Sequence, residues 1–312
     1  MGFLGIDTSC YTTSVAYLAD GQLVERRKLL SVPQGKRGLR QSEALFQHLG
    51  NLPLLLEELS PQLGRITHVA ASTRPRPQED SYLPVFKAGE TVARSIAASL
   101  GCPFIETSHQ AGHLWAGFWS AKERPRENWL AFHLSGGTTD LLLVRPQVSQ
   151  IETLGSSLDL HAGQFIDRVG VRLGLSFPAG PSLEKLARGG QRGKITIPAP
   201  VRGYDLSFGG PEAAACRELE RGADPGDLAL AVILTIGRGV VKVVTRALEE
   251  YEISSLLFVG GVAANKILRD YLREKLEHPK FGARLFFADP HLSTDNAVGV
   301  AVAAREATLW KN

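Results

Sequence analysis

Two segments of the chain share one pattern, and that pattern limits what the chain can fold into. Residues 3–6 are an apolar strand, Asp7-Thr8-Ser9 is a polar turn, and residues 13–18 are a second strand. Residues 129–134, the turn Ser135-Gly-Gly-Thr-Thr-Asp140 and residues 141–144 repeat this order. Strand, polar turn and strand predict a hairpin. Because the two halves share little identity, we expect a duplication of topology alone.

Composition places the chain among globular proteins. The 312 residues are 44% hydrophobic and 21% charged, which suits a packed core and argues against disorder. The 35 Lys and Arg against 32 Asp and Glu give a net charge of +3. This near balance gives no strong electrostatic argument that the protein binds nucleic acid, and it does not exclude such binding.

Cysteine usage and apolar runs predict where the protein works. Cys10, Cys102 and Cys216 are far apart and form no CxxC pair, which favours a reducing, cytoplasmic location. The N-terminal residues have no basic region typical of a signal peptide. The apolar run 228–237 is about half a membrane span and ends at Arg238, so we expect a buried helix and no membrane partner.

The remaining elements alternate between helix and strand. We expect helices over 43–59, 90–100 and 263–276, and strands over 66–71 and 256–259. The strand 256–259 runs into Gly260-Gly261 and a helix, an arrangement whose free backbone amides can contact an anion or a nucleotide. Since no Pro/Ser-rich linker separates the halves, we expect two α/β lobes around a fixed cleft.

His109 and His113 are candidate metal ligands. Residues four apart on a helix share one face, so both imidazoles can reach one ion. Two helical histidines at this spacing also occur as packing or surface residues, and spacing alone leaves both interpretations open. Ala111 and the absence of a glutamate give no support for HExxH peptidase chemistry. A third ligand must come from elsewhere, and Asp295 in the run Ser-Thr-Asp-Asn is a candidate.

The turn 135–140 is a candidate phosphate contact. Its glycines allow close backbone approach, and its hydroxyls and amides can bind phosphate oxygens, although a plain β-turn uses the same residues. Paired with Asp7-Thr8-Ser9, it matches the phosphate clamp of the actin-like, sugar-kinase and heat-shock-chaperone (ASKHA) superfamily. This resemblance implies an α/β, two-lobed ASKHA fold with a central nucleotide cleft, and we expect one lobe to be 1–107 plus 297–312 and the other 108–296.

Asp167 and the following Pro178-Ala-Gly-Pro181 form a third candidate. A carboxylate on a helix at the cleft can hold ribose hydroxyls, and Gly180 allows a ligand to approach. A surface carboxylate beside Arg168 and an ordinary Pro-Gly turn explain the same residues. The sequence leaves both interpretations open.

Taken together, the motifs resemble the TsaD family of tRNA threonylcarbamoyladenosine synthase subunits, formerly called Gcp O-sialoglycoprotein endopeptidases. The resemblance covers nearly the whole chain in the family's motif order. It is carried by GIDTSCYTTSVA (5–16), HQAGHLWA (109–116), HLSGGTTDLLLV (133–144), the stretch 155–187, YDLSFGG (204–210), GGVAANKILR (260–269) and STDNA (293–297).

The resemblance implies transfer of a threonylcarbamoyl group from its adenylate to a tRNA adenosine. It implies a divalent metal on His109, His113 and Asp295, with iron favoured and zinc or magnesium as alternatives. We expect Asp7 and Ser9 to be catalytic. Contacts to the adenine nucleotide or acyl-adenylate are expected from His133, Leu134, Ser135, Gly136, Gly137, Asp167, Gly180 and Asn265. The implied partners are tRNA and other subunits of a transfer complex, including a second ASKHA protein.

Several positions depart from the family pattern. Ala111 and Thr138 replace a glutamate and a histidine, and the other departures are Tyr11, Thr12, Leu160, Gln164 and Glu212. The pattern resembles a divergent paralogue. It keeps open a protein that binds nucleotide and metal but carbamoylates another acceptor, or that serves as a non-catalytic partner subunit.

Overall fold

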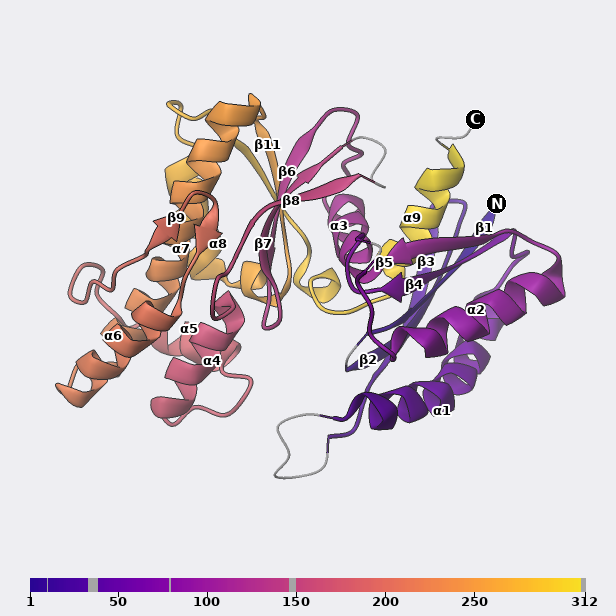
Figure 1. Cartoon of the computed structure of the whole chain (residues 1–312), viewed down its shortest axis with the longest axis horizontal. Coiled ribbons are helices and arrows are strands. Elements are labelled where there is room, and N and C mark those ends of the chain that lie inside the picture. The colour runs from indigo at the N-terminus through magenta and orange to yellow at the C-terminus, as the bar shows by residue number, and fades with distance from the viewer. Residues whose placement is uncertain (10, 33–38, 79, 146–149, 310–312) are drawn as a thin grey trace. The chain divides into compact units, whose positions relative to one another are not determined.

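The computed structural model describes residues 1–9, 11–32, 39–78, 80–145 and 150–309 (Figure 1). Cys10 and most of the basic segment 32–40 lie outside these ranges. The chain forms two compact units. The first comprises Met1–Arg124, Gln147–Ile151 and His291–Asn312, and the second Pro125–Pro146 and Glu152–Pro290.

The first unit is built on a five-stranded sheet in the order β3-β2-β1-β4-β5. Its strands are β1 (Gly2–Thr8), β2 (Thr12–Ala19), β3 (Gln22–Leu29), β4 (His68–Arg74) and β5 (Phe104–Ser108). The hairpin β1–β2 and its neighbour β3 are antiparallel, whereas β4 runs parallel to β1. The predicted first hairpin is therefore confirmed.

Helices cover both faces of this sheet. Helices α1 (Gln41–Leu59) and α2 (Phe86–Leu100) pack on one face, and α9 (Val298–Leu309) packs on the other, beside α3 (His109–Ser120). Successive residues of β1 point to opposite faces. An added β-carbon at Gly5 would lie 2.6 Å from the amide nitrogen of Ala301, so Gly5 lets α9 approach the sheet. Asp7, two residues on, points to that same face.

The second unit repeats the strand order as β8-β7-β6-β11-β12. These strands are β6 (Trp129–Leu134), β7 (Thr139–Val144), β8 (Ile151–Ser156), β11 (Ser255–Val259) and β12 (Arg284–Phe287). As in the first unit, the central strand pairs with an antiparallel hairpin partner on one side and a parallel strand on the other. The predicted duplication of topology is confirmed.

Helices and short elements complete the second unit. They are α4 (Ala162–Arg172), α5 (Gly180–Ala187), α6 (Gly209–Glu220), α7 (Pro225–Tyr251), α8 (Lys266–Leu276) and the two-residue strands β9 (Val201–Arg202) and β10 (Asp205–Leu206). Helix α7 is long and apolar enough to span a membrane, but 78% of its most apolar window is buried inside the structure. It packs against α4, α5, α6 and α8, so the prediction of a buried helix over 228–237 is confirmed.

Two boundaries differ from the sequence prediction. Helix α3 and the segment from His291 to the start of α9 belong to the first unit, whereas the predicted lobes placed 108–296 in the second. The reason is packing, because α3 lies against α9, which itself covers the first sheet. The predicted helix 263–276 begins only at Lys266, after a 3₁₀ turn (Gly261–Ala264).

Asp159 supports the start of α6. Its carboxylate accepts hydrogen bonds from the Ser207 hydroxyl at 2.6 Å and from the amides of Phe208 and Gly209 at 2.7 and 2.9 Å. Burial raises the pKa of this carboxyl, but these bonds outweigh burial and hold its pKa below the ordinary value. An exposed carboxylate with several donors thus takes the place of a helix cap.

Replacing Asp159 by asparagine is expected to cost about 1 kcal/mol of stability at pH 7, because the amide has one acceptor oxygen and no charge. Since the folded-state pKa is depressed, the contribution is fully present above the unfolded pKa of about 4 and is lost as pH falls through the folded value. Urea unfolding from pH 7 downward tests this. The difference in unfolding free energy between the variant and wild type should shrink below about pH 4. The control Asp270→Asn, on the exposed side of α8, should unfold with the same free energy as wild type. A pH-independent difference would contradict the assignment.

Candidate metal centre and nucleotide-contacting turns

Helices α3 and α9 cross at two glycines, and this crossing sets how close the candidate metal ligands lie. A β-carbon at Gly299 would lie 1.7 Å from the carbonyl oxygen of Gly112 and 2.8 Å from the amide nitrogen of Ala116. Only glycine at position 299 lets the two backbones meet. Helix α3 begins at His109, where the Ser108 hydroxyl accepts from the Ala111 amide at 3.1 Å and caps the helix.

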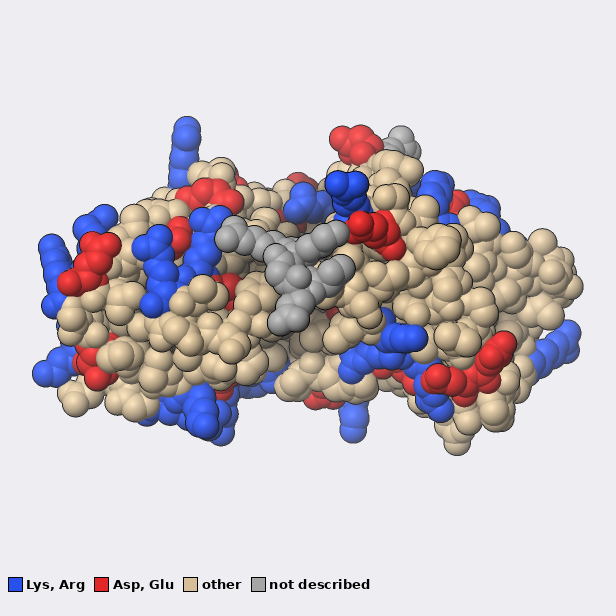
Figure 2. Space-filling view, turned by 90° about the horizontal axis from the view of Figure 1, so that it is seen from below, with Lys and Arg blue, Asp and Glu red and all other residues tan. Residues whose placement is uncertain are grey.

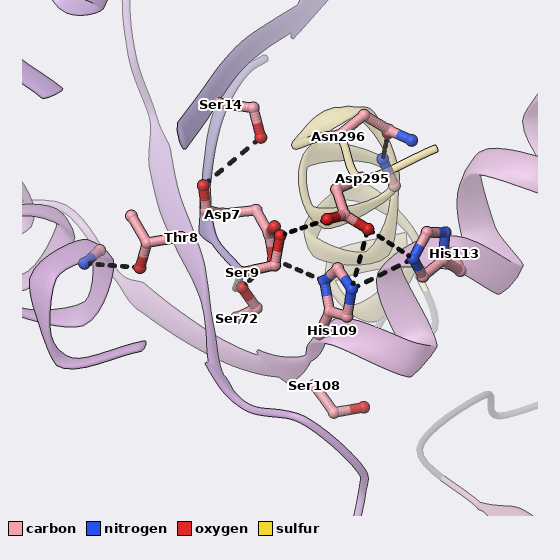
Figure 3. Close-up of polar contacts among 12 residues, drawn as sticks. Asp7, Thr8, Ser9, Ser14, Ser72, Ser108, His109, His113, Asp295 and Asn296 are labelled. Carbon is pink, nitrogen blue, oxygen red and sulfur yellow. Dashed lines mark hydrogen bonds and ion pairs between the residues drawn. The ribbon is translucent and has the colours of Figure 1, made fainter. Parts of the chain in front are cut away.

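His109, His113 and Asp295 converge on one point of the first unit (Figure 3). The Nε2 atoms of the two histidines are 3.1 Å apart, and each lies 3.4 Å from Oδ1 of Asp295. One potential ligand atom from each residue lies within 4.8 Å of the others. The helical spacing of four and the polar run before α9 thus bring together the three residues that the sequence proposed as ligands.

Asp7 lies behind His109, on the side away from the ligand cluster. Its Oδ1 is 3.0 Å from Nδ1 of His109 and also accepts a short hydrogen bond from the Ser72 hydroxyl. Since a carboxylate oxygen accepts, Nδ1 of His109 carries a proton, and Nε2 is the ring nitrogen that binds an ion when the ring is neutral. Asp7 is fully buried, and its Oδ2 has no hydrogen-bond partner among the described residues.

Asp295 is also oriented by its neighbours. The Ser9 hydroxyl donates to Oδ2 of Asp295 at 2.9 Å, which leaves Oδ1 facing the histidines. The side chain of Asn296 donates to the carbonyls of Leu292 and Thr294 at 3.1 and 2.7 Å, and so closes the segment that carries Asp295. The Asp295 side chain remains 30% exposed, which leaves a path for an ion to reach it.

Electrostatics in the cluster favour a charged pair in the protein without metal. Burial lowers the pKa of His109, but Asp7 and Asp295 outweigh burial and hold the pKa well above its ordinary value. Burial raises the pKa of Asp295, but hydrogen bonds from His109 and His113 hold the pKa well below its ordinary value. The site is therefore already arranged around positive charge at its centre.

The donor set fits a divalent transition metal. Two imidazole nitrogens and one carboxylate oxygen form a three-ligand set that zinc and iron both accept, with coordination positions left for water or substrate. Asp7 behind His109 supplies the carboxylate–histidine pair that commonly orients such ligands. Magnesium prefers a site richer in oxygen ligands.

In the second unit, the β6–β7 turn meets two other segments. The β-carbon of an alanine at Gly163, in the first turn of α4, would lie 2.7 Å from Cα of Gly136. A β-carbon at Gly260, whose φ is +95°, would lie 2.4 Å from the carbonyl oxygen of Leu134 and 2.9 Å from Cδ2 of His133. The turn after β6, the start of α4 and the turn after β11 therefore meet at the carboxyl ends of two parallel strands, where α/β sheets commonly bind ligands.

Three other predicted nucleotide contacts are Asp167 on α4, Gly180 at the start of α5 and Asn265 just before α8. Oδ1 of Asp167, on α4, accepts from the amide of Ala179 at 2.7 Å and so fixes the residue before Gly180. Burial raises the pKa of Asp167, and the Ala179 bond opposes the shift. Oδ1 of Asn265 accepts from Leu268 at 2.9 Å and caps α8. Gly136, Gly137 and Gly180 each have open space where a side chain would stand.

The sequence did not identify two residues that support the candidate ligand cluster. Ser72 and Asn296 escaped because serine and asparagine in short polar runs carry no distinctive signal. Ser72 could have been found from topology, since β4 runs parallel to β1 with Ala71 opposite Ile6, which places the next residues, Ser72 and Asp7, side by side.

Basic and acidic side chains of the described residues are interspersed on the side of the molecule drawn in Figure 2. Two of the basic residues over 188–202 are paired with acids. Arg188 lies 3.5 Å from Glu184, and Arg192 lies 2.9 Å from Glu274. These pairs reduce the positive charge that this stretch offers to a polyanion.

The family model and the similar curated proteins point to the same family. The family model for TsaD, tRNA N6-adenosine threonylcarbamoyltransferase, matches residues 55–302. A protein of that name from Thermotoga neapolitana is 33% identical, covering 98% of this chain and 94% of the relative. Another, from Thermus thermophilus, is 32% identical, covering 97% and 92%.

Solved structures agree on the fold. HypF from T. kodakarensis superposes with a TM-score of 0.65 at 14% identity, covering 99% of this chain and 48% of HypF. A ROK family glucokinase from Streptomyces griseus gives 0.54 at 11% identity, covering 99% and 100%. At these identities the likeness concerns the fold, and it confirms the predicted ASKHA-type architecture.

Proposed function

Because this chain belongs to the TsaD family of tRNA N6-adenosine threonylcarbamoyltransferases, we propose that it transfers a threonylcarbamoyl group from threonylcarbamoyl-adenylate to the amine of a tRNA adenosine. The single observation that carries the proposal is the convergence of His109, His113 and Asp295 in a chain whose relatives of this name match along nearly its full length. With tRNA as acceptor, the cytoplasm is the expected location.

The first unit would hold the metal. His109, His113 and Asp295 are the proposed ligands, with iron the favoured ion and zinc or magnesium as alternatives. When bound, the ion supplies a Lewis acid for the carbonyl of the mixed anhydride. Asp7 accepts from Nδ1 of His109, which leaves Nε2 as the ring nitrogen that faces the ion, and Ser9 keeps Oδ1 of Asp295 turned to the histidines. Asp7 and Ser9 thus act in this proposal as residues that orient the ligands.

The second unit would hold the nucleotide part of the acyl-adenylate. Gly136 and Gly137 offer open backbone for phosphate oxygens, and the hydroxyl of Ser135 already donates to and accepts from that turn. Asp167 and Gly180 flank the start of α5 and would contact the ribose. The nucleotide would rest on three buried residues. His133 and Leu134 end β6, and Asn265 directly precedes α8.

Complementation tests the proposal. Expression of this chain in cells depleted of their own synthase is expected to restore threonylcarbamoyladenosine in tRNA, read by mass spectrometry of tRNA nucleosides. The His109→Ala variant, expressed to the same level, should restore less than about 1% of the wild-type amount, because it lacks one of the three proposed metal ligands. A 100-fold loss in rate corresponds to about 2.7 kcal/mol of transition-state stabilisation.

Failure of complementation by a well-expressed wild-type chain would overturn tRNA as the acceptor in that host. Metal and nucleotide binding by the purified chain would then favour carbamoyl transfer to another acceptor. Absence of both would favour a partner subunit without catalysis. Co-purification with other subunits of the host's transfer complex, including a second ASKHA protein, tests the expected partners.

A further inference from the structure

The segment that carries Asp295 is held by a residue far away in sequence. Asp295 lies between a 3₁₀ turn (Pro290–Leu292) and α9, with no strand pairing of its own. Asn296 closes this segment from within, but its bonds go to the segment's own carbonyls and to Gly299. From outside the segment, Ser9 binds the carboxylate of Asp295 itself, and the hold on residues 291–294 comes from another side chain.

Arg27 on β3 makes that contact. Its Nη1 donates to the carbonyl oxygen of His291 at 3.1 Å and to the hydroxyl of Thr294 at 3.0 Å. Its Nη2 lies 2.7 Å from Nδ1 of the His291 ring. A guanidinium has several donors in one rigid plane, so a single side chain binds both ends of the segment 291–294.

The contact also determines which nitrogen of the His291 ring carries the proton, and Glu25 lies beside that nitrogen. Arginine cannot accept a hydrogen bond, so Nδ1 of His291 must be the acceptor, and Nε2 carries the proton. That Nε2 lies 3.6 Å from Oε2 of Glu25, whose side chain is only 9% exposed. Glu25 and Arg27 are two apart on β3 and therefore share the face of the sheet on which α9 packs.

We propose that Arg27 is a positioning residue for Asp295: by holding residues 291–294 against β3, it keeps the carboxylate in reach of His109 and His113 before an ion binds. The inference rests on the metal site of the proposed function. It adds a residue of the edge strand whose hydrogen bonds go to His291 and Thr294. A preorganised ligand loses less conformational freedom on binding, so the affinity for the ion is higher.

The test compares Arg27→Ala with Lys28→Ala. Both remove one positive charge from adjacent residues of β3, but their side chains point to opposite faces. In purified full-length protein without metal, hydrogen–deuterium exchange of the peptide 288–301 should be about 10-fold faster in Arg27→Ala and unchanged in Lys28→Ala. Titration with Zn²⁺ and with Fe²⁺ should show an affinity about 10-fold lower in Arg27→Ala alone.

A double-mutant cycle ties the effect to the contact itself. Thr294→Val removes only the hydroxyl that Arg27 binds, and in the Arg27→Ala background it should add less than in wild type. Arg27→Lys should give an intermediate affinity, because one ammonium cannot bind both ends of the segment. Equal exchange and affinity in the Arg27→Ala and Lys28→Ala variants, or full additivity in the cycle, would overturn the proposal. If wild type bound no ion, the metal site would fail, while the exchange experiment would still decide whether Arg27 holds the segment.

Discussion

Purified His113→Ala protein will bind no stoichiometric Zn²⁺ or Fe²⁺, whereas wild type will bind about one ion per chain. His113 supplies one of three proposed ligand atoms, and its buried ring places Nε2 3.1 Å from Nε2 of His109 and 3.4 Å from Oδ1 of Asp295. Losing a ligand should cost more than the roughly 10–100-fold in affinity that follows loss of an outer partner. Isothermal titration and elemental analysis of the dialysed protein measure the change.

The control for this variant is His278→Ala, which removes an imidazole from the second unit. It should retain the wild-type metal content. A His113→Ala protein with full metal content would show that the ion binds elsewhere, and the assignment of all three ligands would then fall.

Substitution of Gly299 by alanine is expected to be the most damaging single methyl addition in the first unit. The new methyl would stand 1.7 Å from the Gly112 carbonyl, and backbone atoms cannot rotate aside. Helices α3 and α9 must separate, at a cost of about 3 kcal/mol. The same movement draws Asp295 away from the histidines, so urea unfolding and metal titration should both report a loss.

Gly112→Ala is the matched control at the same helix crossing. Its β-carbon would lie 3.5 Å from Cγ2 and 3.9 Å from the amide nitrogen of Val300, and both are ordinary contacts. Alanine also favours the helix by up to about 1 kcal/mol over glycine, so this variant should be as stable as wild type or slightly more stable. Equal stabilities of the two variants would show that the crossing is not limited by Gly299.

Much of the fold could be predicted because its central strands are apolar and end in polar turns. The strands around residues 3–6 and 129–134 are buried on both faces and read as continuous apolar runs. The edge strands β3 and β5 were not predicted. Strand β3 carries Glu25-Arg-Arg-Lys28 and is half exposed, and β5 is short, so neither shows the pattern of a buried strand.

The unit boundary could not be read from the sequence for a related reason. Polar turns and composition do not reveal that α3 packs on α9, because that contact depends on how closely Gly299 meets the backbone of Gly112. The three proposed metal ligands were found from helical spacing and a polar run, and from the resemblance to a known family. Their support by Asp7, Ser72 and Arg27 depends on strand register, which a single sequence does not fix.

The separation of the ligands along the chain has a consequence for synthesis. His109 and His113 leave the ribosome well before Asp295, and the whole second unit is made in between. At about 5–20 residues per second this interval lasts roughly 10–40 s. During that time the nascent chain displays two histidines without their carboxylate. Tight capture of an ion must therefore wait until the second unit has been translated, so metal loading marks a chain in which the whole second unit has been made.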